Sequence, residues 1–160
     1  MYKIFTDGAC KRNGKTGAKG GWAFAIYDEH NNLMFATSGH EENTTNQRME
    51  IIAILKGCEK ITELMENNEF FTCEICSDSA YCIRCHDEAW YDRWESNGWR
   101  TSNREKVKNR ELWEALIPFF KDCRFDFKKV KGHADCEENN FVDELAQRAA
   151  VSELNCFVNK

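Results

Sequence analysis

Two aspartates stand where predicted strands end. Asp7 follows the run at residues 2–6 and Asp78 follows the run at residues 70–77, and both runs are rich in β-branched, aromatic or other apolar residues, as strands are. Open α/β sheets bind their ligands beyond the carboxyl ends of the strands, so both carboxylates are candidates for one shared site. Asp7 also begins an Asp-Gly pair, which is common in turns that do no chemistry.

Two further acidic residues lie near the starts of predicted helices. Glu50 falls one turn before Ile54, on the edge of an apolar helix face, and Asp143 lies four residues after Asn139 on one face of the last helix. A carboxylate in the first turns of a helix is often only a partner of the helix dipole. Glu50 therefore has a chemical interpretation only if another carboxylate lies opposite it.

Nine cysteines raise the alternative of a metal or haem protein. Cys73-x-x-Cys76 and Cys82-x-x-Cys85 resemble the pairs of a zinc ribbon, but five residues separate them, where about 15–20 are usual. In a strand, Cys73 and Cys76 would point to opposite faces. Cys82 to His86 matches the C-x-x-C-H haem motif, without an export signal. We expect free, mostly buried thiols in a reducing compartment.

Aromatic and basic residues form a second candidate surface. Trp90 and Trp94 lie four residues apart, on one face of a helix, and Arg and Lys outnumber acidic residues in the stretch 98–110 that follows. Such residues can contact phosphates and stack on bases. Core packing of the tryptophans and a solvated charged loop remain the alternatives.

The spacing of apolar residues predicts the elements that hold these candidates. Strands are expected at residues 2–9, 21–27, 33–38, 70–78 and 124–130, the first three as an antiparallel meander. A strand reached through a helix is usually parallel to the strand it joins, which indicates an α/β fold.

Helices are expected at residues 45–65, 80–97, 111–117 and 138–155, the second of them as one or two helices. Thr45 or Asn46 is the predicted N-cap of the first. Pro118 is expected to end or kink the third, because proline lacks a backbone N–H.

The composition describes one globular domain. The chain has 160 residues, of which 42% are hydrophobic and 31% charged. No apolar run approaches the roughly 20 residues that span a bilayer, and the N-terminus lacks the features of a signal peptide, so we expect a cytoplasmic protein without a membrane partner. The net charge of −5 argues against nucleic-acid binding by overall attraction, but not against a local basic patch or metal ions.

The motifs occur in an order that resembles type 1 ribonuclease H. They are Thr6-Asp7-Gly8-Ala9, Thr45-Asn46-Gln47-Arg48-Met49-Glu50, Ser77-Asp78-Ser79, Gly98-Trp99-Arg100, and Val130-Lys131-Gly132-His133 with Asp143-Glu144-Leu145-Ala146. The match covers almost the whole chain. It implies that residues 1–160 form a single ribonuclease H catalytic domain, in the ribonuclease H-like fold: a mixed five-stranded sheet, its first three strands antiparallel, flanked by helices. It also implies a monomeric endonuclease that hydrolyses the RNA strand of RNA–DNA hybrids and leaves 5′-phosphate and 3′-hydroxyl ends.

The resemblance assigns catalysis to Asp7, Glu50, Asp78, His133 and Asp143. Carboxylates that share a pocket repel each other, and hard cations such as Mg²⁺ relieve the repulsion. The family uses two such ions with substrate bound, and Mn²⁺ can substitute. By resemblance, Asp7 bridges both ions and Asp143 completes the ion that activates water. Glu50 and Asp78 would hold the ion on the leaving oxygen, while His133 would shuttle protons or help the product leave.

Residues that contact the hybrid are also implied by the resemblance. Asn13, Asn46 and Gln47 match positions that line the minor groove, where a 2′-hydroxyl distinguishes RNA from DNA. Thr45 and Asn109 match a pocket that grips a DNA phosphate. The tryptophan pair matches an aromatic channel for the DNA strand, beside the family's basic protrusion. The substrate-binding set is Asn13, Thr45, Asn46, Gln47, Ser79, Trp90, Trp94, Trp99, Arg100, Asn109 and Asn139.

The sequence departs from many relatives at a few positions. Ala80 replaces a longer side chain, one residue is inserted between Tyr81 and Trp90, and Glu95 and Ser96 stand where lysines are common. These departures concern affinity for the hybrid rather than the chemistry.

Two alternatives to a free-standing nuclease follow from the same resemblance. A non-catalytic ribonuclease H-like nucleic-acid-binding module is one, and the presence of all four carboxylates argues against it. A domain cut from a reverse transcriptase is the other, and Met1 so close to the first strand argues against that. With no hybrid-binding domain ahead of Asp7, we expect a bare catalytic domain.

Overall fold

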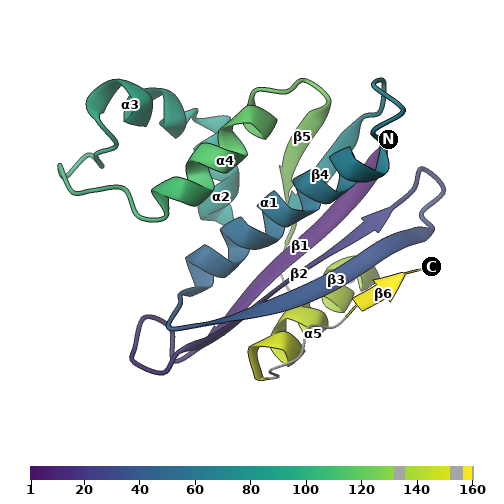
Figure 1. The fold of residues 1–160 in the computed structure, drawn as a ribbon, viewed down its shortest axis with the longest axis horizontal. Helices are drawn as coiled ribbons and strands as arrows, with labels where there is room; N and C mark the ends of the chain where they lie inside the picture. The colour runs from purple at the N-terminus through teal and green to yellow at the C-terminus, as the bar shows by residue number, and fades with distance from the viewer. Residues whose placement is uncertain (132–135, 152–156, 160) are drawn as a thin grey trace.

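A mixed sheet runs through the molecule in the computed structural model, which describes residues 1–131, 136–151 and 157–159 (Figure 1). The strands are β1 (Tyr2–Lys11), β2 (Lys19–Tyr27), β3 (Leu33–Glu42), β4 (Cys73–Ser77), β5 (Phe125–Lys129) and β6 (Phe157–Asn159). Their order across the sheet is β5-β4-β1-β2-β3-β6. The meander β1–β3 is antiparallel, and β4 and β5 run parallel to β1. β4 ends at Ser77, opposite Thr6, whereas β1 continues beyond this pair to Lys11.

The predicted five strands and their directions are confirmed, and the structure adds a sixth. β6 pairs antiparallel with β3, with Phe157 opposite Thr37 and Asn159 opposite Phe35. A strand of three residues is too short to show an alternating pattern, so nothing in the sequence predicted it.

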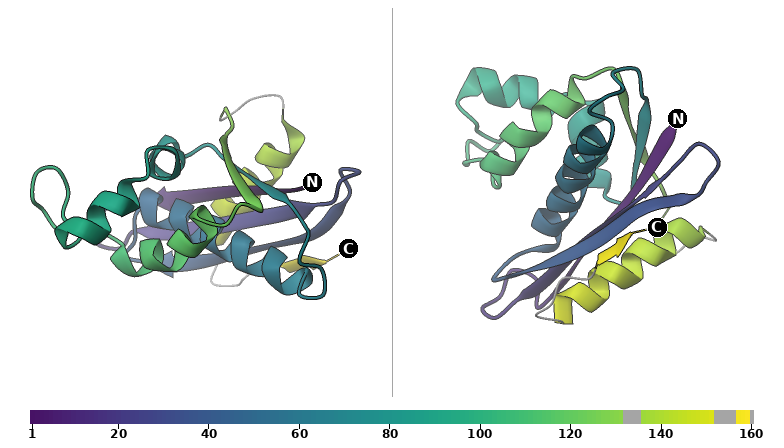
Figure 2. Two further views of the ribbon diagram at one scale, coloured as in Figure 1. Left: turned by 90° about the horizontal axis from the view of Figure 1, so that it is seen from above. Right: turned by 45° about the vertical axis from the view of Figure 1, so that its right-hand side comes forward.

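Helices cover both faces of the sheet (Figure 2). They are α1 (Asn46–Leu64), α2 (Ala80–Asp87), α3 (Trp90–Asn97), α4 (Arg110–Phe120) and α5 (Glu137–Val151). On one face, α1, α2 and α4 bury the larger core with Ile4, Phe24 and Ile26 of the sheet. On the other face, α5 packs over Phe5 and its neighbours. Residues that alternate along β1 thus contact different helices.

The start of α1 and the course of α4 test two predictions. Thr45 is the N-cap of α1, because its side-chain oxygen accepts a hydrogen bond from the backbone N–H of Arg48 at 3.2 Å. The expectation that Pro118 ends its helix is wrong, since α4 continues to Phe120. Pro118 removes the one backbone bond that its own N–H would donate, and buried Ile117 and Phe120 hold this last turn against the core.

The close approach of α5 to β2 depends on Gly21. A Cβ atom at this position would lie 2.0 Å from the carbonyl oxygen of Ala146 and 2.6 Å from the backbone nitrogen of Ala150. Both are backbone atoms of α5, so no side-chain rotation could make room.

Within the described ranges, no helix has both the length and the apolar character needed to cross a membrane.

Candidate active site

An acidic cleft of about 270 Å³ lies beside β1 at the point where β4 ends, lined by Asp7, Gly8, Asn46, Glu50, Asp78, Asn139 and Asp143. Asp7 comes from β1, and Asp78 directly follows β4. Glu50 lies in the second turn of α1, and Asp143 comes from α5 on the opposite face of the sheet. The structure thus brings together four carboxylates that are far apart in the sequence.

The carboxylates approach closely enough to share a ligand. Oxygen atoms of Asp7, Glu50 and Asp78 all lie within 4.8 Å of one another. The side chain of Asp143 is hydrogen-bonded to that of Asp7. Because four like charges in one cleft repel each other, this arrangement needs protons or cations to be stable.

Gly8 allows α1 to reach the end of β1. A Cβ atom there would lie 2.5 Å from the backbone nitrogen of Glu50, and the Gly8 N–H donates to Asp7 Oδ1 at 2.9 Å. The alternative that Asp7-Gly8 forms a turn is therefore wrong, because both residues lie within β1. We did not predict from the sequence that Gly8 lets α1 approach β1, although a glycine directly after Asp7 could have indicated it.

Burial and mutual repulsion perturb two of the carboxyl groups. Burial raises the pKa of Asp7 to about 8, assisted by its hydrogen bond to Asp143 and by the charge of Asp78. Burial also raises the pKa of Glu50 well above its ordinary value, and the charge of Asp7 adds to the effect. Strongly perturbed titratable groups in a cleft are typical of functional sites.

The donor set suits a hard divalent cation. Every candidate ligand atom is a carboxylate oxygen, the kind that Mg²⁺ and Mn²⁺ prefer. Glu50 Oε2 is buried and has no hydrogen-bond partner among the described residues, which is costly for an acceptor unless a cation or water completes it. Asp7, Glu50 and Asp78 therefore fit a metal site, with Asp143 beside them.

The raised pKa of Asp7 leads to a prediction for the pH dependence of stability in the metal-free protein. Between the ordinary pKa of 3.8 and about 8, the folded protein keeps a proton that the unfolded chain has released. The free energy of unfolding should therefore fall as the pH rises through this range, and the stabilisation is lost above the folded-state value. Thermal melts in chelator at pH 4 to 9 would show this, with Asp7→Asn, which cannot titrate here, as the reference. The same pH dependence in both proteins would contradict it.

Residues predicted to read the minor groove lie at the edge of the cleft. Asn46 lines it, while Asn13 and Gln47 are exposed nearby. Asn13 Oδ1 accepts a hydrogen bond from the backbone N–H of Asn46 at 2.9 Å, which ties the turn after β1 to the start of α1. Ser79 caps α2 by accepting from the Cys82 N–H. Asn139 lies inside the cleft, and its buried Oδ1 has no partner among the described residues.

The tryptophans line a second cleft and also pack in the core. Trp90 and Trp94 border a cleft of about 420 Å³ together with exposed Arg100. Trp94 is only 7% exposed, and the ring of Trp99, 8% exposed, lies tilted beside it with ring centroids 5.6 Å apart. Arg110 covers the Trp99 ring at 5.0 Å. Trp99 is thus a core residue here, whereas Trp90 and Arg100 remain available at the surface.

Three predicted site residues remain: Thr45 and Asn109, which the structure describes, and His133. Thr45 and Asn109 are the N-caps of α1 and α4, and both contact Arg48. His133 lies outside the described residues. Arg48 was not among the predicted site residues, because its contacts join segments that are distant in the sequence.

The cysteines lie as predicted for fillers of the core. Cys73 packs in the core beneath α1, whereas Cys76 packs in the core beneath α5, so their thiols lie on opposite faces of β4. Burial raises the pKa of both Cys76 and Cys85 to about 12. Thiols with such a pKa are poor nucleophiles and poor metal ligands at neutral pH.

Comparison with known proteins gives consistent matches over most of the chain. A family model for RNase H matches residues 1–151. Ribonuclease H of Caldicellulosiruptor saccharolyticus is 39% identical over 152 residues, which cover 94% of this chain and 96% of that protein. Ribonuclease H of Acetivibrio thermocellus is 41% identical over 144 residues, covering 89% of this chain and 90% of that protein.

Solved structures match the fold at lower identity. LC11-RNase H1 in complex with an RNA/DNA hybrid has a TM-score of 0.68 and 22% identity, covering 94% of this chain and 96% of that one. A foamy viral protease-reverse transcriptase in complex with an RNA/DNA hybrid has a TM-score of 0.78 and 20% identity, covering 94% of this chain and 20% of that one.

Proposed function

Because this chain belongs to the ribonuclease H family, we propose that it is an endonuclease that hydrolyses the RNA strand of RNA–DNA hybrids. The observation that carries the proposal is the convergence of Asp7, Glu50, Asp78 and Asp143 in one cleft. The hybrid in the structure of LC11-RNase H1, which shares the fold, supports the choice of substrate. We further propose that the chain acts as a single-domain monomer in the cytoplasm.

The cleft would hold Mg²⁺, two ions when substrate is present, and Mn²⁺ would be able to substitute. Asp7, Glu50 and Asp78 offer ligand atoms close together, and Asp143 extends the set. Two such ions supply the activation of a water nucleophile and the neutralisation of charge on the phosphate. The buried, unpaired oxygen of Glu50 supports this assignment, because a cation would satisfy it.

The products follow from an in-line displacement at phosphorus. Water attacks opposite the 3′ oxygen, the bond between phosphorus and that oxygen breaks, and the strand is left with a 5′-phosphate and a 3′-hydroxyl. Asp7 is 5% exposed, and its carboxylate would help to hold the cations that bind the reacting phosphate. His133 is proposed to carry the proton between solvent and the site.

Substrate selection would use the residues around the cleft. Asn13, Asn46 and Gln47 are proposed to contact 2′-hydroxyls and bases of the RNA strand in the minor groove. Trp90 and Arg100, on the second cleft, would stack on the DNA strand and contact its phosphates. Cleavage would therefore require one strand with 2′-hydroxyls and one without.

A labelled hybrid tests the proposal directly. In Mg²⁺ the protein should cut the RNA of an RNA–DNA hybrid, and it should leave duplex RNA and duplex DNA of the same sequence intact. End-group analysis of the fragments should find 5′-phosphates. Full cutting in excess chelator, or equal cutting of duplex DNA, would contradict the proposal. Hybrid binding without any cutting would point to a non-catalytic binding module instead.

A further inference from the structure

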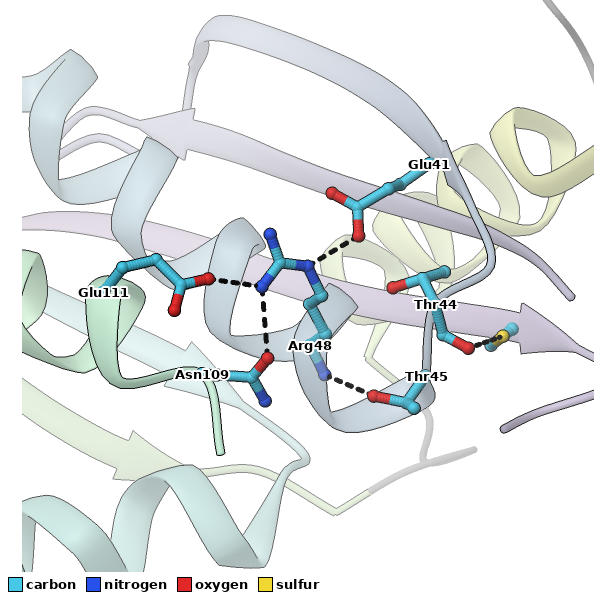
Figure 3. Close-up of polar contacts among 7 residues, drawn as sticks. Glu41, Thr44, Thr45, Arg48, Asn109 and Glu111 are labelled. Carbon is cyan, nitrogen blue, oxygen red and sulfur yellow. Dashed lines mark hydrogen bonds and ion pairs between the residues drawn. The ribbon is translucent and has the colours of Figure 1, made fainter. Parts of the chain in front are cut away.

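Arg48 joins three segments of the chain at the start of α1 (Figure 3). Its Nε donates to Glu41 Oε1 of β3 at 2.6 Å. Its Nη1 donates to Glu111 Oε1 of α4 at 2.7 Å and to Asn109 Oδ1 at 3.1 Å. The side chain is 28% exposed, so these charge-assisted bonds hold one defined geometry.

The charge of Arg48 is already balanced by two carboxylates. Glu41 and Glu111 both pair with the guanidinium, and together they carry one negative charge more than it supplies. A phosphate next to this group would meet net negative charge. Arg48 is therefore poorly suited to bind an anion itself.

Asn109 has a conformation that its place at a helix start does not require. Its φ of 60° is in the left-handed region, and its side chain makes no capping bond to α4. Its Oδ1 accepts from Arg48 instead. A guanidinium has only donors, so it fixes the amide with the oxygen inward and leaves the two N–H donors of Nδ2 facing elsewhere.

Thr45 is held beside Asn109 by the backbone of Arg48, through the N-cap bond of α1 and not through the guanidinium. Its Oγ1 accepts from the backbone N–H of Arg48, so its hydroxyl hydrogen is also left as a donor. In the part of the chain that the structure describes, neither this hydroxyl nor Nδ2 of Asn109 has an acceptor. Figure 3 shows both side chains beside Arg48, away from Glu41. The guanidinium of Arg48 thus occupies the acceptor of Asn109, the backbone N–H of the same residue occupies that of Thr45, and the donors of both side chains are left free.

We propose that Arg48 is a positioning residue for a backbone phosphate of the DNA strand: its guanidinium orients Asn109 to bind the phosphate beside Thr45, without touching the phosphate itself. The proposal rests on the proposed function, because it takes an RNA–DNA hybrid as the ligand. Donors that are already held in place lose little conformational entropy when they bind an anion. Orientation by Arg48 should therefore increase the affinity for the hybrid.

The test compares binding of hybrids in which one DNA phosphate at a time is replaced by an uncharged methylphosphonate. Binding is measured in chelator, so that it does not depend on cleavage. The variants are Arg48→Ala, which frees the Asn109 amide, and Asn109→Asp, which keeps an acceptor for Arg48 but removes the N–H donors. Arg124→Ala is the matched control: Arg124 is similarly half-buried and pairs with Asp122, at the opposite end of β5 from the cleft.

In the wild type, methylphosphonate replacement should affect binding at one DNA phosphate. It should weaken binding about tenfold there, as expected for the loss of a charge-assisted hydrogen bond. Both site variants should bind the unmodified hybrid about tenfold more weakly and lose that sensitivity. The Arg124→Ala protein should show the wild-type profile. The melting temperature of Asn109→Asp should be no lower than that of the wild type, so weaker binding by this variant reports a role in binding and not in stability. If Arg48→Ala does not fold, Asn109→Asp still tests the proposal.

Three results would overturn the inference. One is a sensitive position that persists in Arg48→Ala, and another is the absence of any sensitive DNA position in the wild type. The third concerns the slope of the logarithm of the binding constant against the logarithm of the salt concentration. If this slope decreases in Arg48→Ala by the amount expected for one lost phosphate contact, Arg48 contacts the phosphate directly. Because the scan needs no cleavage, it can support or reject this role whether or not the protein proves to be a nuclease.

Discussion

Replacing Asp7 by asparagine should lower the rate of hybrid cleavage at least about a thousandfold, on the order of 4 kcal/mol of activation free energy. The substitution keeps the size of the side chain and removes the charge at the centre of the carboxylate cluster, within 4.8 Å of Glu50 and Asp78. Single-turnover cleavage at saturating protein would measure the loss. Hybrid binding should persist, because the proposed binding residues lie on other elements.

The same variant should be more stable than the wild type without metal. Asp7→Asn relieves repulsion in the cluster, so its melting temperature in chelator should rise, and the increase on adding Mg²⁺ should shrink. Asp126→Asn, on the exposed side of β5, is the matched control and should change neither property. Cleavage by Asp7→Asn within tenfold of the wild type, or an unchanged Mg²⁺ effect, would show that Asp7 is not a central ligand.

Substituting Gly21 by alanine should destabilise the whole protein by about 3 kcal/mol, the upper range for overpacking. The new methyl group would meet backbone atoms of Ala146 and Ala150, so α5 must move away from β2. At about 2–4 °C per kcal/mol, the melting temperature should fall by about 6–12 °C. Activity should fall as well at temperatures where the fold persists, because α5 carries Asp143.

A glycine in open space provides the control for this second substitution. Gly14 has a φ of +74°, and a Cβ atom added there would have no other atom within 4 Å, so Gly14→Ala should cost only about 1 kcal/mol for the left-handed backbone. Circular dichroism melts of the two variants would compare them. Equal melting temperatures would show that α5 adjusts to the added methyl group without loss of packing.

Local patterns in the sequence predicted most of the fold. The runs before Asp7 and Asp78 lie in strands β1 and β4, which are side by side and parallel, although β1 continues past Asp7 to Lys11. Thr45 caps α1 as its residue type suggests. These features depend on alternation, helical spacing and capping, which act over a few residues and are therefore visible in the sequence.

Features that depend on distant contacts were not predictable in this way. β6 exists because the edge of β3 offers it backbone partners. α4 continues past Pro118 because core contacts hold its last turn. Arg48 reaches Glu41, Asn109 and Glu111 across segments separated by up to 63 positions, and no local pattern reports such a meeting.

The placement of Asp143 in the last long helix has a consequence for the protein as it is being made. Asp7, Glu50 and Asp78 all emerge from the ribosome before α5, which must then dock on β1 and β2 to bring in the fourth carboxylate. A nascent chain therefore has no complete cleft until residues 137–151 are free to fold. Any activity that needs all four carboxylates can therefore begin only after synthesis has passed this helix.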